Sequence, residues 1–298
     1  MRIFVTGATG FIGSAVVREL IDAGHQVIGL TRSDQGAASL AGIGVEVCRG
    51  DLSDLDSLRG GVVRSDGVIH TGFVHDFSNF AACCETDRLA ILAMGSELAG
   101  SDRPMLVTDG IGIAEAGRLR TEDDPPTPPS PMLPRVSSQT AESLRGQGVR
   151  ISVVRVPQVH DRSKSGVFTY AVAAARAKGA SAYIGDGSNR FAAVHVRDAA
   201  RLYRLALEGG SAEARYHAVA EEGLTFREVA EAIGRGTKTP VISLPPGEAV
   251  EHFGVIGPLL GLDLAASGQW TQERLAWRPT GPGLIADLDS VGEVLAGS

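Results

Sequence analysis

The fold is decided by a stretch near the start of the chain, which reads Arg2-Ile3-Phe4-Val5-Thr6-Gly7-Ala8-Thr9-Gly10-Phe11-Ile12-Gly13. The short apolar run before the first glycine predicts a β-strand, and the apolar spacing from Phe11 to Ala23 predicts a helix. The glycines between these two elements predict a tight turn. A strand, a glycine turn and a helix in this order are typical of the first βαβ unit of a nucleotide-binding fold.

Each of the three spaced glycines suits a bound diphosphate. Gly7 permits a sharp turn after the strand, Gly10 lets the backbone approach a pyrophosphate, and Gly13 lets the helix pack closely on the sheet. The free N–H groups and the dipole of the first helical turn attract the phosphates. The alternative is a turn with a structural role only. The residues expected to contact the cofactor here are Gly7, Ala8, Thr9, Gly10, Phe11, Ile12 and Gly13.

Composition narrows the class of protein. The 298 residues are 43% hydrophobic and 21% charged, which is ordinary for a soluble globular protein. The net charge of −7 argues against nucleic acid or an anionic membrane as a partner, and no apolar run reaches the roughly 20 residues of a membrane span. The first predicted strand leaves no room for a signal peptide, so we expect a cytoplasmic protein. The three cysteines indicate neither a disulfide framework nor a metal site, and we expect reduced thiols.

Strands and helices alternate along the first half of the chain. Apolar strands with short connections predict an α/β protein of the Rossmann type, with a doubly wound parallel sheet. A long helix over residues 80–98 is expected to hold Asp87 and Arg88 on a solvated face, and Ser53 is the expected cap of an earlier helix. Further strands are predicted at residues 27–31, 45–49, 66–70, 104–108 and 149–155.

The second half of the chain changes in character. We interpret the proline-rich stretch from Glu122 to Pro131 as a loop over the active face, with a linker as the alternative. We expect a nucleotide-binding Rossmann domain over residues 1–160, to which some later segments return, and a smaller C-terminal α/β substrate lobe over residues 161–298. Thr225 and Glu228 are placed as a capping box. Helices are predicted at residues 168–178, from Ala193 to Leu207, and at 267–277 before a proline–glycine tail.

The carboxyl ends of the strands supply a second set of candidate cofactor contacts, because ligands of such sheets collect at that edge. Backbone groups around Pro157 and Val159 are positioned to hold the carboxamide of a nicotinamide. The other residues expected at this rim are Asp51, Leu52, Thr71, Gly72, Phe73 and Thr108.

The end of the second strand distinguishes between the two nicotinamide dinucleotides. An acidic side chain there hydrogen-bonds the free 2′-hydroxyl of NAD and repels a 2′-phosphate. The segment reads Thr31-Arg32-Ser33, with no carboxylate before Asp34. A guanidinium and two hydroxyls suit a phosphate, so we expect NADP rather than NAD. If Arg32 is simply solvated on the surface, this preference disappears.

The chain also carries an ordered set of motifs: Thr6–Gly13, Gly50-Asp51-Leu52, Val68-Ile69-His70, Arg155-Val156-Pro157 and Val194-His195-Val196-Arg197-Asp198-Ala199-Ala200. This set resembles the extended short-chain dehydrogenases/reductases, the family of nucleotide-sugar epimerases, dehydratases and 3β-hydroxysteroid dehydrogenases. The resemblance covers nearly the whole chain. It implies a Rossmann fold, a bound NAD(P) and a small-molecule substrate.

The proton-transfer residues of that family are missing. Family enzymes use a tyrosine as general acid/base, a lysine four residues later that lowers its pKa, and a serine or threonine after the fifth strand. The segment from Met132 to Gln139, where the pair belongs, holds neither a tyrosine nor a lysine, and Asp109 stands at the usual serine position. The tyrosines Tyr170, Tyr183, Tyr203 and Tyr216 are followed four positions on by Ala174, Gly187, Leu207 and Ala220.

Three residues are candidates to replace the missing acid. Asp109 ends a strand beside the expected nicotinamide, with a helix-capping or loop-fixing role as the alternative. His75 and His160 follow rim segments and carry imidazoles that titrate in a useful range, with packed or solvated roles as the alternative. His195 is interpreted as structural. Arg135 and Ser138 are expected to orient a substrate carbonyl or carboxylate, and Phe73 and Phe168 to line the substrate site.

Three functions remain open on the sequence. The first is an NADP-dependent oxidoreductase that acts on a carbonyl or alcohol, with a non-standard acid/base. The second is a non-redox epimerase, dehydratase or cyclase on the same fold. The third is a redox-inert NADP sensor. The expected partner is a small-molecule substrate, and a homodimer is left open.

Overall fold

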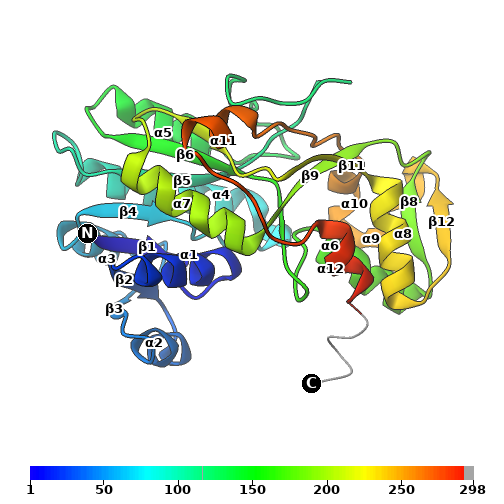
Figure 1. The fold of residues 1–298 in the computed structure, drawn as a ribbon, viewed down its shortest axis with the longest axis horizontal. Helices are drawn as coiled ribbons and strands as arrows, with labels where there is room; N and C mark the ends of the chain where they lie inside the picture. Colours follow the sequence, from blue (N-terminus) through cyan, green and yellow to red (C-terminus); the bar gives the residue numbers. More distant parts are fainter. Residues whose placement is uncertain (116, 292–298) are drawn as a thin grey trace.

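The structure, a computed structural model, describes residues 1–115 and 117–291. Its centre is a parallel sheet with the strand order β10-β6-β5-β4-β1-β2-β3 (Figure 1). This is the Rossmann α/β arrangement that the sequence predicts. The strands are β1 (Arg2–Thr6), β2 (Gln26–Thr31), β3 (Glu46–Arg49), β4 (Gly67–His70), β5 (Met105–Gly110), β6 (Ile151–Val156) and β10 (Arg215–His217).

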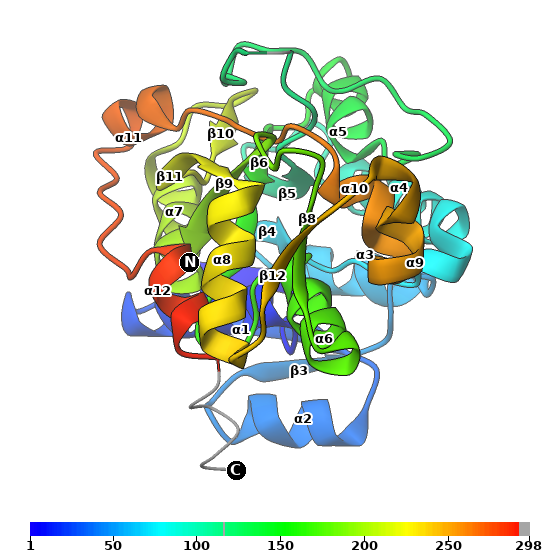
Figure 2. The same ribbon diagram turned by 90° about the vertical axis from the view of Figure 1, so that its right-hand side faces the viewer.

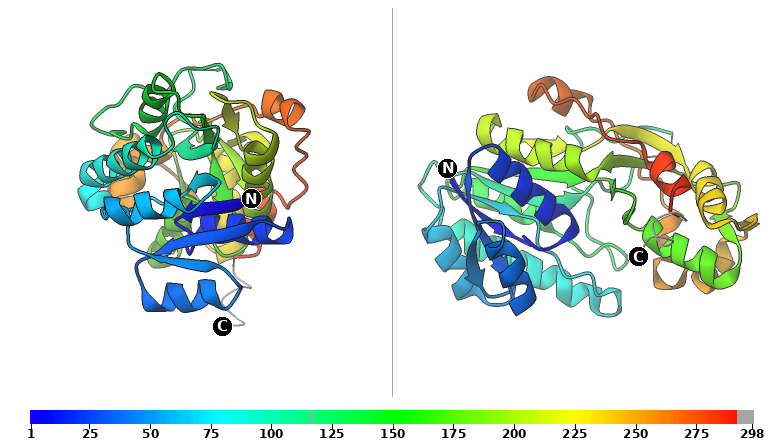
Figure 3. Two further views of the ribbon diagram at one scale, coloured as in Figure 1. Left: turned by 90° about the vertical axis from the view of Figure 1, so that its left-hand side faces the viewer. Right: turned by 60° about the horizontal axis from the view of Figure 1, so that its bottom comes forward.

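Side chains of β1 alternate between two apolar layers, one on each face of the sheet. Ile3 and Val5 pack into the layer formed with α1 and α7, whereas Phe4 packs into the layer formed with α3, α4 and α5. Figure 3 shows α1 and α7 side by side on their face of the sheet. Full burial of one such side chain stabilises the fold by about 1.5–3 kcal/mol. The helices are α1 (Phe11–Asp22), α2 (Asp34–Ala41), α3 (Leu55–Val63), α4 (Phe80–Ser96), α5 (Ser137–Arg145) and α7 (Val196–Gly209).

Two smaller sheets form the other end of the molecule (Figure 2). One has the order β11-β9-β7 and the other pairs β12 with β8 in parallel. Their strands are β7 (Gln158–His160), β8 (Ser181–Ile184), β9 (Arg190–His195), β11 (Glu221–Thr225) and β12 (Val241–Leu244). The helices here are α6 (Phe168–Lys178), α8 (Phe226–Thr237), α9 (Ala249–Phe253), α10 (Gly257–Leu260), α11 (Gln269–Arg274) and α12 (Leu284–Asp289). The short 3₁₀ turns are η1 (Phe77–Asn79), η2 (Pro246–Glu248) and η3 (Gly254–Ile256).

The structure corrects three local predictions. Residues 193–195 belong to strand β9, and α7 begins only at Val196 with His195 as its N-cap. Asp54, not Ser53, caps α3. A further helix, α12, lies in the predicted proline–glycine tail. The capping box of Thr225 and Glu228 is confirmed, with the Glu228 N–H donating to the Thr225 hydroxyl.

Within the described residues, no helix combines the length and the apolar character that crossing a membrane requires.

Candidate active site

A cavity of about 690 Å³ lies where the carboxyl ends of the parallel strands meet the smaller sheets. Segments that are far apart in the sequence line it together, including the glycine turn and the ends of β4, β5 and β6. The predicted site residues among its lining are Gly7, Gly10, Phe11, Ile12, Gly13, Thr71, Gly72, Phe73, His75, Asp109, Arg135, Ser138, Pro157 and Val159.

The glycine turn fits a dinucleotide pyrophosphate. Gly7 has a φ of +66°, and a Cβ there would lie 2.7 Å from the backbone nitrogen of Gly72. A Cβ on Gly13 would collide with the Gly7 carbonyl, whereas a Cβ on Gly10 would approach only that carbonyl oxygen, at 3.1 Å. No side chain of the described residues caps α1. The N–H groups of its first turn therefore remain available to an anion.

The end of β2 carries an unengaged cation. The guanidinium of Arg32 is exposed and makes no hydrogen bond or ion pair with any described residue. The nearest carboxylate along the chain, Asp34, is held by Arg49 at 2.9 Å. Ser33 accepts a hydrogen bond from the Gly36 N–H at 3.0 Å and caps α2. The charge of Arg32 also helps to lower the pKa of Asp51, so a carboxylate lies near this cation although none is bonded to it.

The other residues that were predicted to contact the cofactor do not line the cavity. Ala8 and Thr31 are buried, and Leu52 would contact a Cβ on Gly72. The carboxylate of Asp51 accepts hydrogen bonds from the hydroxyl of Ser53 at 2.6 Å and its N–H at 2.8 Å, which lower the pKa of Asp51. The residues of this group are Ala8, Thr9, Thr31, Arg32, Ser33, Asp51, Leu52 and Thr108.

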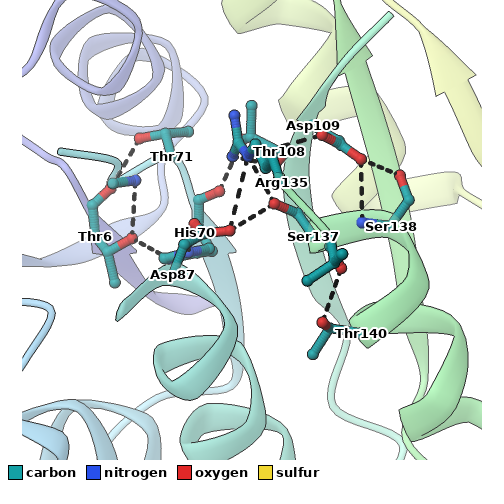
Figure 4. A network of polar contacts seen from close by, with 12 residues as sticks. Thr6, His70, Thr71, Asp87, Thr108, Asp109, Arg135, Ser137, Ser138 and Thr140 are labelled. Atoms are coloured by element: carbon teal, nitrogen blue, oxygen red, sulfur yellow. Dashed lines mark hydrogen bonds and ion pairs between the residues drawn. The ribbon is translucent and has the colours of Figure 1, made fainter. Parts of the chain in front are cut away.

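The prediction that Asp87 lies on a solvated face of α4 is wrong, because this residue is only 1% exposed. It accepts hydrogen bonds from His70 Nε2 at 3.1 Å and from the Ser137 hydroxyl at 2.5 Å (Figure 4). The other ring nitrogen of His70 contacts the hydroxyl of Thr6 at 2.7 Å. Burial alone would raise the pKa of Asp87, but the Arg135 cation and these hydrogen bonds outweigh it, and that pKa is lowered.

Arg135 joins this buried carboxylate to the cavity. Its Nε lies 3.7 Å from oxygens of both Asp87 and Asp109, and its Nη2 donates to the Thr108 carbonyl at 2.8 Å. The guanidinium also stacks on Phe73, with Cζ 4.2 Å from the ring centroid. The arginine is therefore held on several sides, and its position is fixed by the protein rather than by a ligand.

Asp109 faces the cavity from the end of β5. Its Oδ2 accepts a hydrogen bond from the Ser138 N–H at 3.1 Å and another from the Ser138 hydroxyl (Figure 4). The neighbouring Thr108 side chain turns away and bonds the hydroxyl of Tyr203 at 2.7 Å. Asp109 thus caps the start of α5, which is the structural role that the sequence left open for it. It also lines the cavity, as a catalytic role requires.

Of the three remaining candidate site residues, one lines the cavity and two do not. His75 lines the cavity, and desolvation at the wall together with the Arg135 cation lowers its pKa. His160 does not line the cavity, so its catalytic role is corrected: the ring is fully buried and its Nδ1 bonds Asp287 at 2.8 Å. Phe168 is also corrected, because it is fully buried in the core against Phe191.

Sequence reasoning missed several lining residues. Arg120 follows β5 within an irregular loop, and Arg155, although part of a motif of the family resemblance, was not predicted to line the site. Lys164 and Tyr170 lie beyond β7, where no motif draws attention to them. The one available signal for the arginines is a charged side chain beside the carboxyl end of a strand.

The fold and the cavity define a class of protein, namely a Rossmann enzyme with a dinucleotide turn. The model of the NAD dependent epimerase/dehydratase family matches residues 3–82. Uncharacterized protein C2A9.02 of Schizosaccharomyces pombe is 46% identical over 97% of this chain and 99% of its own length. The chain therefore belongs to this family of extended short-chain dehydrogenases/reductases. It is an enzyme of the NAD-dependent oxidoreductase or epimerase type.

Two further comparisons are more distant. The 2-alkyl-3-oxoalkanoate reductase of Stenotrophomonas maltophilia is 26% identical over 70% of this chain and 66% of its own length. The UDP-glucose 4-epimerase of Thermus thermophilus, solved in complex with NAD, is 22% identical. Its structure covers 100% of both chains with a TM-score of 0.77, which shows a shared fold.

Proposed function

We propose that the protein is an NADP-dependent oxidoreductase that acts on a carbonyl or alcohol of a small molecule, with Asp109 as its acid/base. One observation carries this proposal: the Asp109 carboxylate lines the same cavity as the glycine turn. The relative from Stenotrophomonas maltophilia supports a net redox reaction, because its name describes a reductase.

The residues around the turn fit a dinucleotide. Gly10 and Gly13 would hold the diphosphate on the first turn of α1, since no side chain obstructs the backbone there. Backbone groups of Pro157 and Val159 line the cavity where a carboxamide is expected. When bound, the nicotinamide supplies or accepts a hydride.

Asp109 exchanges the proton that accompanies hydride transfer. In alcohol oxidation its carboxylate accepts the hydroxyl proton, and in carbonyl reduction its carboxyl group returns a proton to the substrate oxygen. Ser138 fixes one carboxylate oxygen, and the Arg135 guanidinium, 3.7 Å from the other, stabilises negative charge that develops on the substrate oxygen. This arrangement takes over the task of the absent tyrosine and lysine.

The preference for NADP rests on Arg32. An unengaged guanidinium at the end of β2 suits a 2′-phosphate, and the pairing of Asp34 with Arg49 removes the carboxylate that would repel it. Ser33 adds a hydroxyl next to this cation.

The test is whether the protein consumes NADPH in the presence of a panel of ketones and aldehydes. The loss of absorbance of the reduced nicotinamide measures this consumption. We expect stoichiometric formation of the alcohol. The matched control is Gly10→Val, in which we expect no consumption because the diphosphate site is blocked. Conversion of a substrate without any net oxidation or reduction of the nicotinamide would establish a non-redox enzyme instead. NADPH binding without turnover of any compound in the panel would likewise contradict the proposal.

A further inference from the structure

Two arginines bring positive charge to one part of the cavity wall. Arg120, in the loop after β5, is 7% exposed, and Arg155, on β6, is 1% exposed. Both line the cavity, although neither belongs to the network around Asp109 and Arg135. Buried cations usually have a carboxylate partner, because desolvation disfavours the charged form.

Neither arginine forms an ion pair within the described part of the chain. Arg120 donates through Nη1 to the carbonyl of Ile113 at 2.8 Å and through Nη2 to the carbonyl of Pro125. Arg155 donates through Nη1 to the carbonyl of Asp124 at 2.9 Å, and the same nitrogen lies 3.4 Å from Nε2 of His217. The three carbonyls and the imidazole are neutral, so the charge of the two guanidinium groups is not balanced by these contacts.

The two arginines also keep unused donors. Arg120 Nε and Arg155 Nη2 are buried and have no hydrogen-bond partner among the described residues. The carboxylate of Asp124 acts on Arg120 through its charge, but its ion pair is with Arg118 at 2.8 Å, and it bonds neither Arg120 nor Arg155. Burial and the repulsion between the two cations lower the pKa of Arg155 to about 10. Such a group gains most from an anion that enters the cavity.

Gly112 brings the Arg120 guanidinium up to the cavity wall. This glycine lines the cavity with a φ of +79°, and a Cβ on it would lie 3.1 Å from Arg120 Cζ and 3.3 Å from Nε. The missing side chain therefore leaves the guanidinium next to cavity-lining backbone. Another part of the lining is aromatic and consists of Phe73, Phe77, Phe80 and Tyr170.

We infer that Arg120, supported by Arg155, binds a carboxylate of the substrate, while the aromatic lining takes the apolar part. The inference rests on the proposed function and narrows the substrate class to oxo acids or hydroxy acids with an apolar body. Arg155 contributes positive charge nearby, and the Nε–H of Arg120, which has no partner among the described residues, supplies the direct hydrogen bond. The oxygen to be reduced or oxidised would then lie toward Asp109.

The experiment compares two probes of similar shape, 4-phenylbutyrate and its neutral amide, on the protein saturated with NADPH. Calorimetry gives the dissociation constant of each probe. We expect the carboxylate to bind about 10-fold or more tightly than the amide, because a charge-assisted hydrogen bond distinguishes them. In Arg120→Gln this ratio falls to about one, and in Arg120→Lys part of it remains.

Arg59→Gln is the control, because Arg59 is an arginine on the surface of α3 that does not line the cavity and has no contact with Arg120 or Arg155. It should leave the ratio unchanged. Equal binding of the two probes by the wild-type protein would overturn the inference, as would an equal loss of ratio in Arg59→Gln or a preserved ratio in Arg120→Gln. Turnover of neutral ketones with NADPH is a separate readout, so failure of the proposed function is distinguishable from failure of the carboxylate site.

Discussion

Ser138 donates two hydrogen bonds to the same carboxylate oxygen of Asp109, one from its backbone N–H and one from its hydroxyl. Ser138 lies in the first turn of α5, and Asp109 lies near the end of β5. The carboxylate therefore satisfies a free N–H group at a helix start that has no side-chain cap of its own. The contact holds Asp109 against the segment in which family enzymes place their tyrosine and lysine.

Asp109→Asn separates proton transfer from capping, because the amide oxygen still accepts from Ser138 but the side chain no longer exchanges a proton. We expect turnover to fall about 100-fold or more, with unchanged NADPH affinity and melting temperature. Steady-state kinetics and thermal unfolding provide the measurements. Asp186→Asn is the control, since Asp186 lies in an exposed turn with Ser188. Wild-type turnover in Asp109→Asn would leave this aspartate with a structural role only.

Gly10 and Gly13 should respond differently to the same substitution. Gly10→Val is expected to abolish dinucleotide binding with little loss of stability, because a Cβ there meets only the Gly7 carbonyl oxygen, at 3.1 Å. Gly13→Val should unfold or strongly destabilise the protein, since its Cβ would collide with that same carbonyl. NADPH titration and thermal unfolding distinguish the two variants. Normal NADPH affinity in Gly10→Val would refute the diphosphate assignment.

Arg32→Glu tests the preference for NADP. The variant should bind NADPH about 10- to 100-fold more weakly, because the charge-assisted bonds to the 2′-phosphate are lost and replaced by repulsion. NADH affinity should change little, and fluorescence titration measures both. Arg59→Glu makes the same change of charge on α3 and should leave both affinities intact. An unchanged preference in Arg32→Glu would show that Arg32 is merely solvated.

His217 should make stability depend on pH. Burial, followed by the neighbouring Arg155 and Arg120 cations, lowers its pKa from 6.5 to about 3, and its Nδ1 is bonded to the Ser267 carbonyl at 2.8 Å. Because the folded pKa is depressed, this contribution to stability is complete above pH 6.5 and is lost as the pH falls toward 3.

Urea unfolding across that pH range is the measurement. Wild-type protein should lose a few kcal/mol of unfolding free energy, on the order expected for such a pKa difference. His217→Gln should show a smaller loss. Parallel pH curves for the two proteins would contradict this account of His217.

The sequence predicted the parts of the fold that depend on local pattern. The Gly7–Gly13 turn, the parallel strands and the capping box at Thr225 follow from spacing and turn chemistry, which act over a few residues. Asp109 was also recognised, because its place at a strand end is visible in the chain. These features need no knowledge of distant partners.

The errors concern side chains whose partners come from elsewhere. Asp87 looks like a surface carboxylate on a helix, but His70 on β4 and Ser137 on α5 bring it into the interior. His160 looks like a rim residue until Asp287, near the end of the chain, engages it. Arg120 was overlooked because its position in an irregular loop gives no periodic signal. Tertiary contacts, not propensity, decide each of these cases.

Segments late in the chain return to the main sheet, and this limits where the chain can be divided into fragments that fold. Strand β10 extends the sheet beside β6, and α7 covers the layer that contains Ile3 and Val5. A fragment that stops at residue 160 would leave that layer open to water and prone to aggregate. Exchange of the C-terminal half between relatives would therefore succeed only if β10 and α7 stayed with the N-terminal half, so recombination breakpoints must flank them.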